Sequence, residues 1–331
     1  MASIKEVAKH AGVAISTVSK VLNNYPNVSE ETKEKVKAAI EELGYVPNAV
    51  AAALSSKKSG RIAIILRLYN GTSAIDEVNM QYLYGTINTA RDVGLDVVTL
   101  FYSMFEENSV EEMTNYLLSQ SISGIIICGM GLKEKPFREL VDNQRFKVVS
   151  IDSPILNEST SYVTIDQYKA QYEVAKKTKE MDPGPHKKLL YITGTIVSPN
   201  VQSRIEAIKQ FAKDYEMELT IRIGDFDEKK AREITLAEGE AHDMIVCASD
   251  LMAIGAMRAL IDMDIFRPVC GFDGITLMGY VGQQMNTVKQ DFQLAAETAV
   301  GELKRLLDGE ESRAVVLDHE LVRLNYSDIL K

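Results

Sequence analysis

The chain has 331 residues, of which 46% are hydrophobic and 25% are charged, so it can bury more than one core and wholesale disorder is excluded. Its three cysteines exclude a disulfide scaffold and favour a reducing compartment. Because no signal-peptide core or membrane-length apolar stretch is present, we expect a cytoplasmic protein with no membrane partner.

Charge is distributed unevenly along the chain. The formal net charge is −10, which by itself argues against a nucleic-acid partner. The first 60 residues nevertheless carry lysines in excess of glutamates, so the acidic surplus lies entirely in the remainder. A basic head on an acidic body would confine contact with DNA to the head, because the body repels phosphates.

The first 47 residues predict three short helices. Ser3, with a glutamate three residues later, forms a capping-box pattern before the first helix, and Gly12 is a natural stop. A second helix is expected over 15–23, and a third begins after Ser29 and ends at Gly44. Residues 48–60 are expected to form a short alanine-rich hinge and a polar linker.

From residue 61 onward, apolar strand-like runs alternate with amphipathic helical segments. The strand-like runs are 62–66, 95–101, 124–128, 147–152, 188–193, 218–223, 244–249 and 267–273. Helical periodicity marks 78–93, 108–120, 165–181, 200–215 and 250–263. The predicted fold class is therefore α/β, with a three-helix helix-turn-helix head followed by two doubly wound parallel-sheet subdomains. Ligands in such sheets bind at the carboxyl ends of the strands.

The second predicted helix has a face suited to the major groove of DNA. Val18, Val21 and Leu22 point inward by their spacing. The outward positions are Ile15, Ser16, Thr17, Ser19 and Lys20. Short hydroxyls allow close approach to a groove, and a lysine reaches guanine acceptors. The pattern alone leaves open an ordinary three-helix bundle with a solvated face.

Two longer sequence motifs favour a DNA-binding head over an ordinary three-helix bundle, because they resemble a known family. The segments IKEVAKHAGVAISTVSKVLNN and NVSEETKEKVKAAIEELGYVPNAVAAAL, followed by the α/β body, resemble the lactose/galactose repressor (LacI/GalR) family of bacterial transcription regulators. The resemblance covers nearly the whole chain and implies a periplasmic-binding-protein-like body. It also implies a homodimer that reads a palindromic operator and is controlled by a small, sugar-like metabolite.

The resemblance assigns DNA contacts by position. Bases are read by Ile15, Ser16 and Lys20, and the backbone is held by Thr17, Ser19, Asn23, Asn27 and Tyr45, while Asn48 is a further DNA-binding residue. Leu54 matches a leucine that wedges into the minor groove from a hinge helix formed only on DNA. Without DNA, a flexible linker is the alternative at this position. Ala14 departs from the family's usual serine and removes a helix cap.

The resemblance also divides the body and places an effector pocket in it. The first subdomain is expected at 61–161 and 291–318, and the second at 162–290 and 319–331. The expected effector-binding residues are Arg67, Asp152, Arg204, Phe226, Ser249 and Asp273. Arg204 and Asp273 would pair as donor and acceptor for ring hydroxyls, and Phe226 would stack on a sugar face.

Departures from the family make the pocket unusual. Ser249 stands where sugar-binding members often have asparagine, and it reaches less far. Arg67 lies where a strand opens onto the cleft, which raises the hypothesis that Arg67 and Arg204 clamp a phosphate or carboxylate. A solvated arginine or a structural ion pair is the alternative for Arg67.

Other function classes find little support in the sequence. There is no phosphate-binding glycine loop, nucleophile elbow or paired catalytic carboxylate, so we expect no enzyme, cofactor or metal site. A solute-binding protein without DNA function remains the alternative for the body alone. Within the regulator class, a protein or phosphorylated co-repressor is the alternative to a free sugar.

Overall fold

A computed structural model describes residues 3–22, 28–45, 60–68, 77–131, 134–182, 184–195, 198–281 and 284–324. The chain divides into two compact units, a head before residue 61 and an α/β body after it. The predicted contacts Asn23, Asn27, Asn48 and Leu54 lie outside the described residues, as does nearly all of the predicted hinge. In the described part, no helix is long and apolar enough to cross a membrane.

The head consists of three helices, α1 (Ile4–Ala11), α2 (Ile15–Leu22) and α3 (Glu30–Leu43). The predicted capping box is present, since the Ser3 hydroxyl accepts from the Glu6 N–H and the Glu6 carboxylate accepts from the Ser3 N–H. Gly12 ends α1 in the left-handed conformation. The helices enclose a small core formed by Val7, Ala8, Val18, Val21, Val36 and Ala39.

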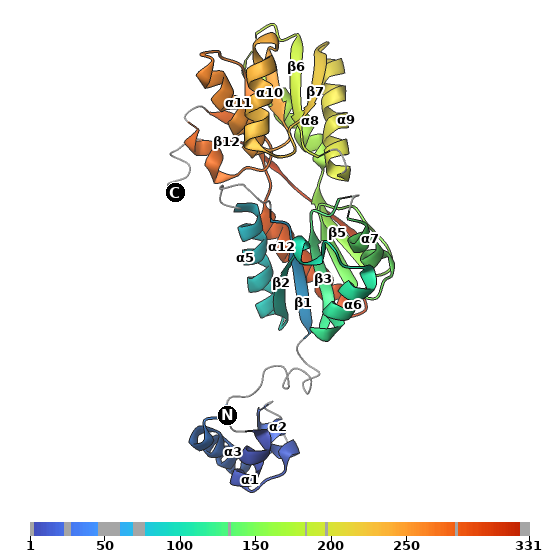
Figure 1. The fold of residues 1–331 in the computed structure, drawn as a ribbon, viewed down its shortest axis with the longest axis vertical. Helices are drawn as coiled ribbons and strands as arrows, with labels where there is room; N and C mark the ends of the chain where they lie inside the picture. The colour runs from blue at the N-terminus through green and yellow to red at the C-terminus, as the bar shows by residue number, and fades with distance from the viewer. Residues whose placement is uncertain are drawn as a thin grey trace. The chain divides into compact units, whose positions relative to one another are not determined.

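The first subdomain of the body is a six-stranded sheet in the order β11-β5-β4-β3-β1-β2. Its strands are β1 (Arg61–Leu66), β2 (Asp96–Phe101), β3 (Ile122–Cys128), β4 (Lys147–Ile151), β5 (Thr160–Ile165) and β11 (Ala314–Leu317). Its helices are α5 (Glu77–Asp92), α6 (Val110–Ser119), α7 (Lys135–Asp142) and α12 (Phe292–Leu307), with a short 3-10 turn η1 (Tyr102–Phe105). Figure 1 shows α5 on one side of this sheet and α6 and α7 on the other.

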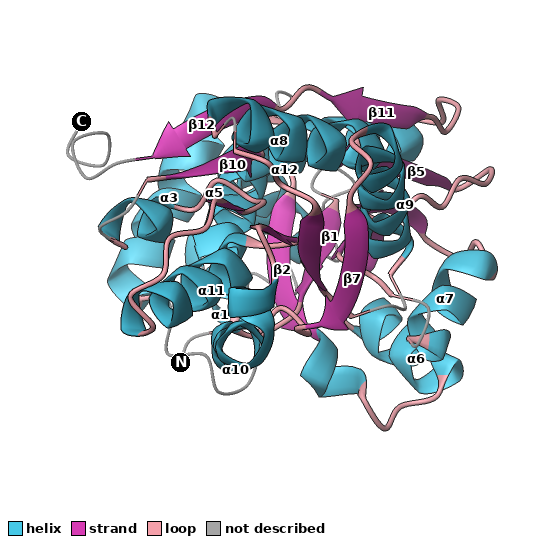
Figure 2. Cartoon of the chain, turned by 90° about the horizontal axis from the view of Figure 1, so that it is seen from above, coloured by secondary structure: helices cyan, strands magenta, loops and turns pink. Residues whose placement is uncertain are grey.

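The second subdomain repeats this plan with the order β12-β10-β9-β8-β6-β7. Its strands are β6 (Lys188–Thr193), β7 (Glu218–Ile223), β8 (Met244–Cys247), β9 (Val269–Cys270), β10 (Met285–Lys289) and β12 (Glu320–Leu324). Its helices are α8 (Gln167–Met181), α9 (Pro199–Asp214), α10 (Glu228–Glu238) and α11 (Asp250–Asp262), with 3-10 turns η2 (Gly239–Ala241) and η3 (Thr276–Tyr280). Helices flank the strands on both sides when the chain is seen from above (Figure 2). Among the strand pairs whose register is given by the described residues, only the pair of β10 and β12 is antiparallel.

The chain passes between the two sheets three times, after β5, after β10 and after β11. The first crossing corrects the predicted boundary between residues 161 and 162, which falls inside β5. All of β5 belongs to the first sheet, because Val163 and Ile165 pair with β11 just as the start of the strand pairs with β4. Its alternating polar and apolar residues gave no continuous apolar run, which is why the sequence did not mark it as a strand.

Candidate functional site

The head presents one face of α2 to solvent. Val18 and Val21 bury the opposite face in the head core, which fixes the orientation of the helix. Ile15, Ser16 and Lys20, the predicted base-reading residues, are exposed, and Thr17 and Ser19 are half-buried at the edges of this face. Tyr45, a predicted phosphate contact, packs against the same core with its ring half-buried. The arrangement is that of a recognition helix whose buried face packs against the other two helices of the head.

The first turn of α2 lacks a side-chain cap. Ala14 occupies the N-cap position, since its carbonyl accepts from the Thr17 and Val18 N–H groups, but its methyl group can accept nothing. We expect Ala14→Ser to stabilise α2 by about 1 kcal/mol, because a serine hydroxyl would accept from an unpaired first-turn N–H. Hydrogen exchange of the α2 amides in the full chain measures this directly. Unchanged or faster exchange would contradict the assignment, and Ala14→Val, which also lacks a hydroxyl, is the control.

In the body, Arg204 is a buried cation at the centre of the cleft between the subdomains. It lies on α9 and is 6% exposed. Its Nε donates to Gln167 Oε1 over 2.8 Å, and its Nη1 donates to the Ala248 carbonyl over 2.6 Å. The guanidinium lies 3.5 Å from the centroid of the Phe272 ring. Arg204 is therefore held rigidly, as a residue that binds a ligand should be.

Asp152 joins the two subdomains. It follows β4 in the left-handed conformation, with φ of 58°. Within its own subdomain it accepts from Thr164 and Tyr82, and from the second subdomain it accepts from Gln167 Nε2 over 3.1 Å. Asn200 of α9 also donates to its carbonyl. Burial raises the pKa of the Asp152 carboxyl, although the nearby Arg204 opposes the shift.

Two further carboxylates, Asp250 and Asp273, end neighbouring strands of the second sheet. Asp250 is fully buried and accepts from the N–H groups of Gly274 and Ile275 and from the Thr287 hydroxyl. Asp273 accepts from Gln290 Nε2 over 3.1 Å. Burial raises the pKa of Asp273, and the charges of Asp250 and Asp152 raise it further against Arg204. The cleft thus holds two buried carboxyl groups, Asp152 and Asp273, near the Arg204 guanidinium, and Asp250 lies beside Asp273.

The raised pKa of Asp273 gives a prediction about stability. A carboxyl group whose pKa is higher in the folded chain keeps its proton there after the unfolded chain has lost it. The free energy of unfolding then falls as pH rises above about 3.8, which is the pKa of this carboxyl in the unfolded chain. We therefore expect Asp273→Asn to raise the midpoint of thermal unfolding, with a larger gain at about pH 8 than at about pH 5.

Differential scanning calorimetry of both proteins at the two pH values measures this gain. The exposed Asp262→Asn, on the same subdomain, serves as the control and should show no pH-dependent gain. An Asp273→Asn gain that is the same at both pH values would contradict the assignment.

Ser249 and Phe226 take positions that limit their predicted roles. The Ser249 hydroxyl caps α11 by accepting from the Met252 N–H over 3.3 Å, so only its hydrogen and one remaining lone pair are left for a ligand. The Phe226 ring lies directly over Gly194, where an added Cβ would come within 2.1 Å of the ring. Any larger residue at 194 would displace the ring. Phe226 is thus packed on the backbone and half-buried.

Arg67 is already neutralised. Its Nη2 lies 2.6 Å from Glu134 Oε1, and its guanidinium lies 4.2 Å from the centroid of the Tyr102 ring. Arg204 is engaged by Gln167 and a carbonyl, so the two arginines do not form an open pair for an anion. This geometry favours the structural ion pair over the phosphate clamp for Arg67.

The described cleft is closed. Across it, the Thr276 N–H and hydroxyl both donate to Glu77 Oε2, in addition to the bonds that reach Asp152. The cavity beside Asp152 and Gln290 measures only about 10 Å³, room for a single water at most. A ligand larger than one water therefore does not fit this cavity unless the residues that line it move.

Sequence reasoning missed several residues that build this cleft. They are Glu77, Tyr82, Gln167, Asn200, Asp250, Thr276 and Gln290. Asp250 carried a signal, because it directly follows Ser249 at the end of an apolar strand. The others lie on helices or at crossings, where no local pattern marks them. In the described ranges, no three His, Cys, Asp or Glu side chains gather as metal ligands.

Two family models match the chain. Residues 3–48 match the model of bacterial regulatory proteins of the lacI family, and residues 141–311 match the periplasmic binding protein domain. The first match coincides with the three-helix head, and the second covers most of the body.

Curated relatives match over nearly the whole chain. It is 28% identical to catabolite control protein A of Priestia megaterium, covering 96% of this chain and 97% of the relative. It is 29% identical to the ribose operon repressor of Halalkalibacterium halodurans, covering 88% and 86%. It is 26% identical to the transcriptional regulator AscG of Escherichia coli (strain K12), covering 93% of each.

Solved structures share the fold. A lac repressor dimer bound to operator and the anti-inducer ONPF superposes with a TM-score of 0.81 at 24% identity, covering 97% of this chain and 98% of that one. The regulator CelR in complex with cellobiose gives a TM-score of 0.71 at 24% identity, covering 98% and 99%. With a helix-turn-helix head before a two-lobed α/β body and these matches to both parts, the chain belongs to the lacI family of bacterial regulatory proteins.

Proposed function

We propose that the chain is a transcriptional repressor that binds an inverted-repeat operator as a homodimer and is controlled by a sugar-like metabolite bound between its subdomains. The observation that carries the proposal is the exposed face of α2, with Ile15, Ser16 and Lys20 outward and its opposite face locked in the head core. A regulator of this kind acts on the chromosome, which places it in the cytoplasm. The relatives are regulators rather than enzymes, which supports a role without catalysis.

The cleft chemistry suits a polyhydroxylated ligand. Arg204 supplies a charged donor, and Asp152 and Asp273 supply acceptors from opposite sides. Ring hydroxyls donate and accept at once, so such a set can satisfy them all. A phosphorylated effector is less well matched, because Arg67 is already paired and carboxylates outnumber the free cations in the described lining. The fused head argues against a plain solute-binding protein.

A dimer requires a self-complementary apolar surface, and α5 offers one. Met80, Tyr84 and Ile87 recur at helical spacing on its exposed side, and Tyr84 is 60% exposed. An apolar stripe of this kind on a helix of a folded domain marks an interaction site. We propose that this stripe lies in the dimer interface.

We expect Tyr84→Asp to weaken the dimer at least about tenfold, because it introduces a buried, unpaired charge into the interface. Analytical ultracentrifugation over a concentration series measures the dissociation constant. Tyr116→Asp, an exposed tyrosine on α6, is the matched control. Equal dimer stability in the two variants would place the interface elsewhere.

The proposed function is tested by selecting duplexes from a random pool with the purified full chain. We expect an enriched inverted repeat with half-sites about one helical turn apart. A thermal-shift screen of sugars, sugar phosphates and nucleosides then identifies effectors, and the enriched duplex is titrated with and without each one. Failure to enrich any inverted repeat would refute the proposal.

A further inference from the structure

A second cavity lies in the second subdomain, away from the effector cleft. It measures about 270 Å³ and opens between the end of α8, the side of α11 and the segment leading into β9. It also reaches the first residues of β10 and the edge strand β12. The cleft faces the other end of β10, where Gln290 bonds Asp273, so the two sites are separated by the length of that strand.

Asn286 places an unsatisfied acceptor in the wall of this cavity. The residue is 4% exposed. Its Nδ2 donates to Thr178 Oγ1 over 2.9 Å, and that hydroxyl donates in turn to the Val174 carbonyl over 2.8 Å, which fixes the orientation of the amide. Asn286 Oδ1 is left buried with no partner among the described residues. Buried acceptors are rarely left unpaired, so this one points to a missing donor.

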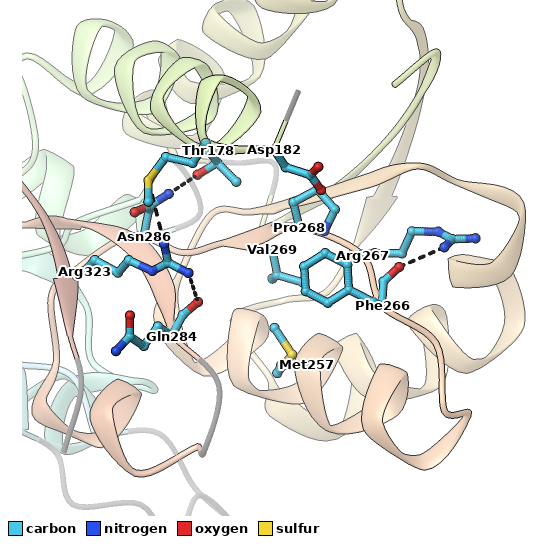
Figure 3. A pocket seen from close by; sticks show the side chains of 11 residues that line it. Thr178, Asp182, Met257, Phe266, Arg267, Pro268, Val269, Gln284, Asn286 and Arg323 are labelled. Carbon is cyan, nitrogen blue, oxygen red and sulfur yellow. Dashed lines mark hydrogen bonds between the residues drawn. The ribbon is translucent and has the colours of Figure 1, made fainter. Parts of the chain in front are cut away.

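Arg323 supplies an open cation beside that acceptor. It faces Asn286 directly across the antiparallel β10–β12 pair, which puts both side chains on the same face of the sheet. Its guanidinium makes only long contacts, 3.4 Å to the Gln284 carbonyl and 3.9 Å to Met181 Sδ. No carboxylate of the described chain lies within ion-pair distance of it. The pair therefore offers an acceptor and a charged donor side by side (Figure 3).

The opposite wall is apolar and aromatic. Phe266 is 66% exposed, the most exposed of the large apolar side chains in the described part of the chain. Met257 lies below its ring and Val269 lies beside it (Figure 3). A phenyl ring flanked by a methionine is a favourable surface for a flat aromatic ligand.

The two other charged residues that line the cavity do not attract an anion: Arg267 is already hydrogen-bonded, and Asp182 repels anions. The three donor nitrogens of Arg267 bond the carbonyls of His242, Phe266 and Glu240, so Arg267 serves the loop. Asp182 stands at the rim and faces His186 at 3.7 Å. A carboxylate entering the cavity would therefore be directed away from Asp182 and toward Arg323.

We propose that this cavity binds a small aromatic carboxylate whose acid group is flanked by an N–H or O–H donor. The carboxylate pairs with Arg323, the neighbouring donor satisfies Asn286 Oδ1, and the ring packs on Phe266 and Met257. This site is separate from the effector cleft, and the proposal does not depend on which metabolite binds in that cleft.

Isothermal titration of the full chain with indole-2-carboxylate tests the proposal. We expect saturable binding to one site per chain. Benzothiophene-2-carboxylate lacks the N–H and indole lacks the acid, so each is expected to bind about tenfold more weakly or worse. Arg323→Gln, on the exposed edge strand, should weaken indole-2-carboxylate about tenfold, and Phe266→Ala should also weaken it.

Two controls locate the binding. Arg258→Gln, an exposed arginine on α11 paired with Glu228, should leave the affinity unchanged. Arg204→Gln, which alters the effector cleft, should also leave it unchanged. The proposal is overturned if indole-2-carboxylate does not bind, if Arg323→Gln binds it as well as the parent chain does, or if only Arg204→Gln abolishes binding.

Discussion

Lys20→Ala is expected to weaken operator binding at least about tenfold, because each lysine that contacts a base contributes about 1–3 kcal/mol and the dimer carries two. The side chain is exposed on α2 and has no carboxylate partner among the described residues, so no ion pair within them competes with DNA for it. The loss should be largest for the selected operator and small for random duplex. Fluorescence anisotropy with both duplexes at fixed salt measures the two losses.

Lys37→Ala is the matched control for this result. Lys37 is an exposed lysine of the same head, but it lies on α3 and not on α2. We expect it to change operator affinity only slightly and selectivity not at all. If the two variants lose affinity equally and for every duplex, α2 does not read sequence and the assignment of the recognition face fails.

Arg204→Gln is expected to remove the response to the effector while leaving operator binding by the effector-free chain largely intact. Losing a charged donor to a ligand hydroxyl costs about 1.5–3 kcal/mol, so effector affinity should fall at least about tenfold. The shorter amide cannot reach both Gln167 and the Ala248 carbonyl, and it places no charge toward a ligand hydroxyl. Calorimetric titration with the effector found by thermal shift measures the loss.

Stability must be separated from binding in this variant, because Arg204 also supports the cleft. Arg232→Gln, an exposed arginine of the same subdomain paired with Asp262, controls for removal of a charge. Circular dichroism and operator affinity establish that the Arg204→Gln chain is folded. A folded chain that binds the effector as tightly as the parent would show that the pocket lies elsewhere.

The head was predictable because its signals are local. Ser3 and Gly12 mark the ends of α1 by rules that depend on a few neighbouring residues, and the structure follows them. The spacing of Val18 and Val21 gave the buried face of α2 for the same reason. In the body, continuous apolar strands such as β3 were equally clear.

The cleft was less predictable because its contacts span long stretches of sequence. Arg204 and Asp273 could be placed at strand and helix ends, but the partners of Arg204 come from α8 and from the residue after β8. The pairing of Arg67 with Glu134 depends on two strand ends meeting at one sheet edge. The sequence also did not predict the antiparallel pairing of β10 with β12, and so it did not predict the second cavity beside that pair.

Operator binding and effector binding should influence each other reciprocally. Operator affinity is measured with and without saturating effector, and effector affinity is measured with and without saturating operator. If effector and operator binding are linked, both affinities change by one and the same factor, corresponding to about 1–3 kcal/mol. Two binding events that leave each other unchanged would contradict this linkage.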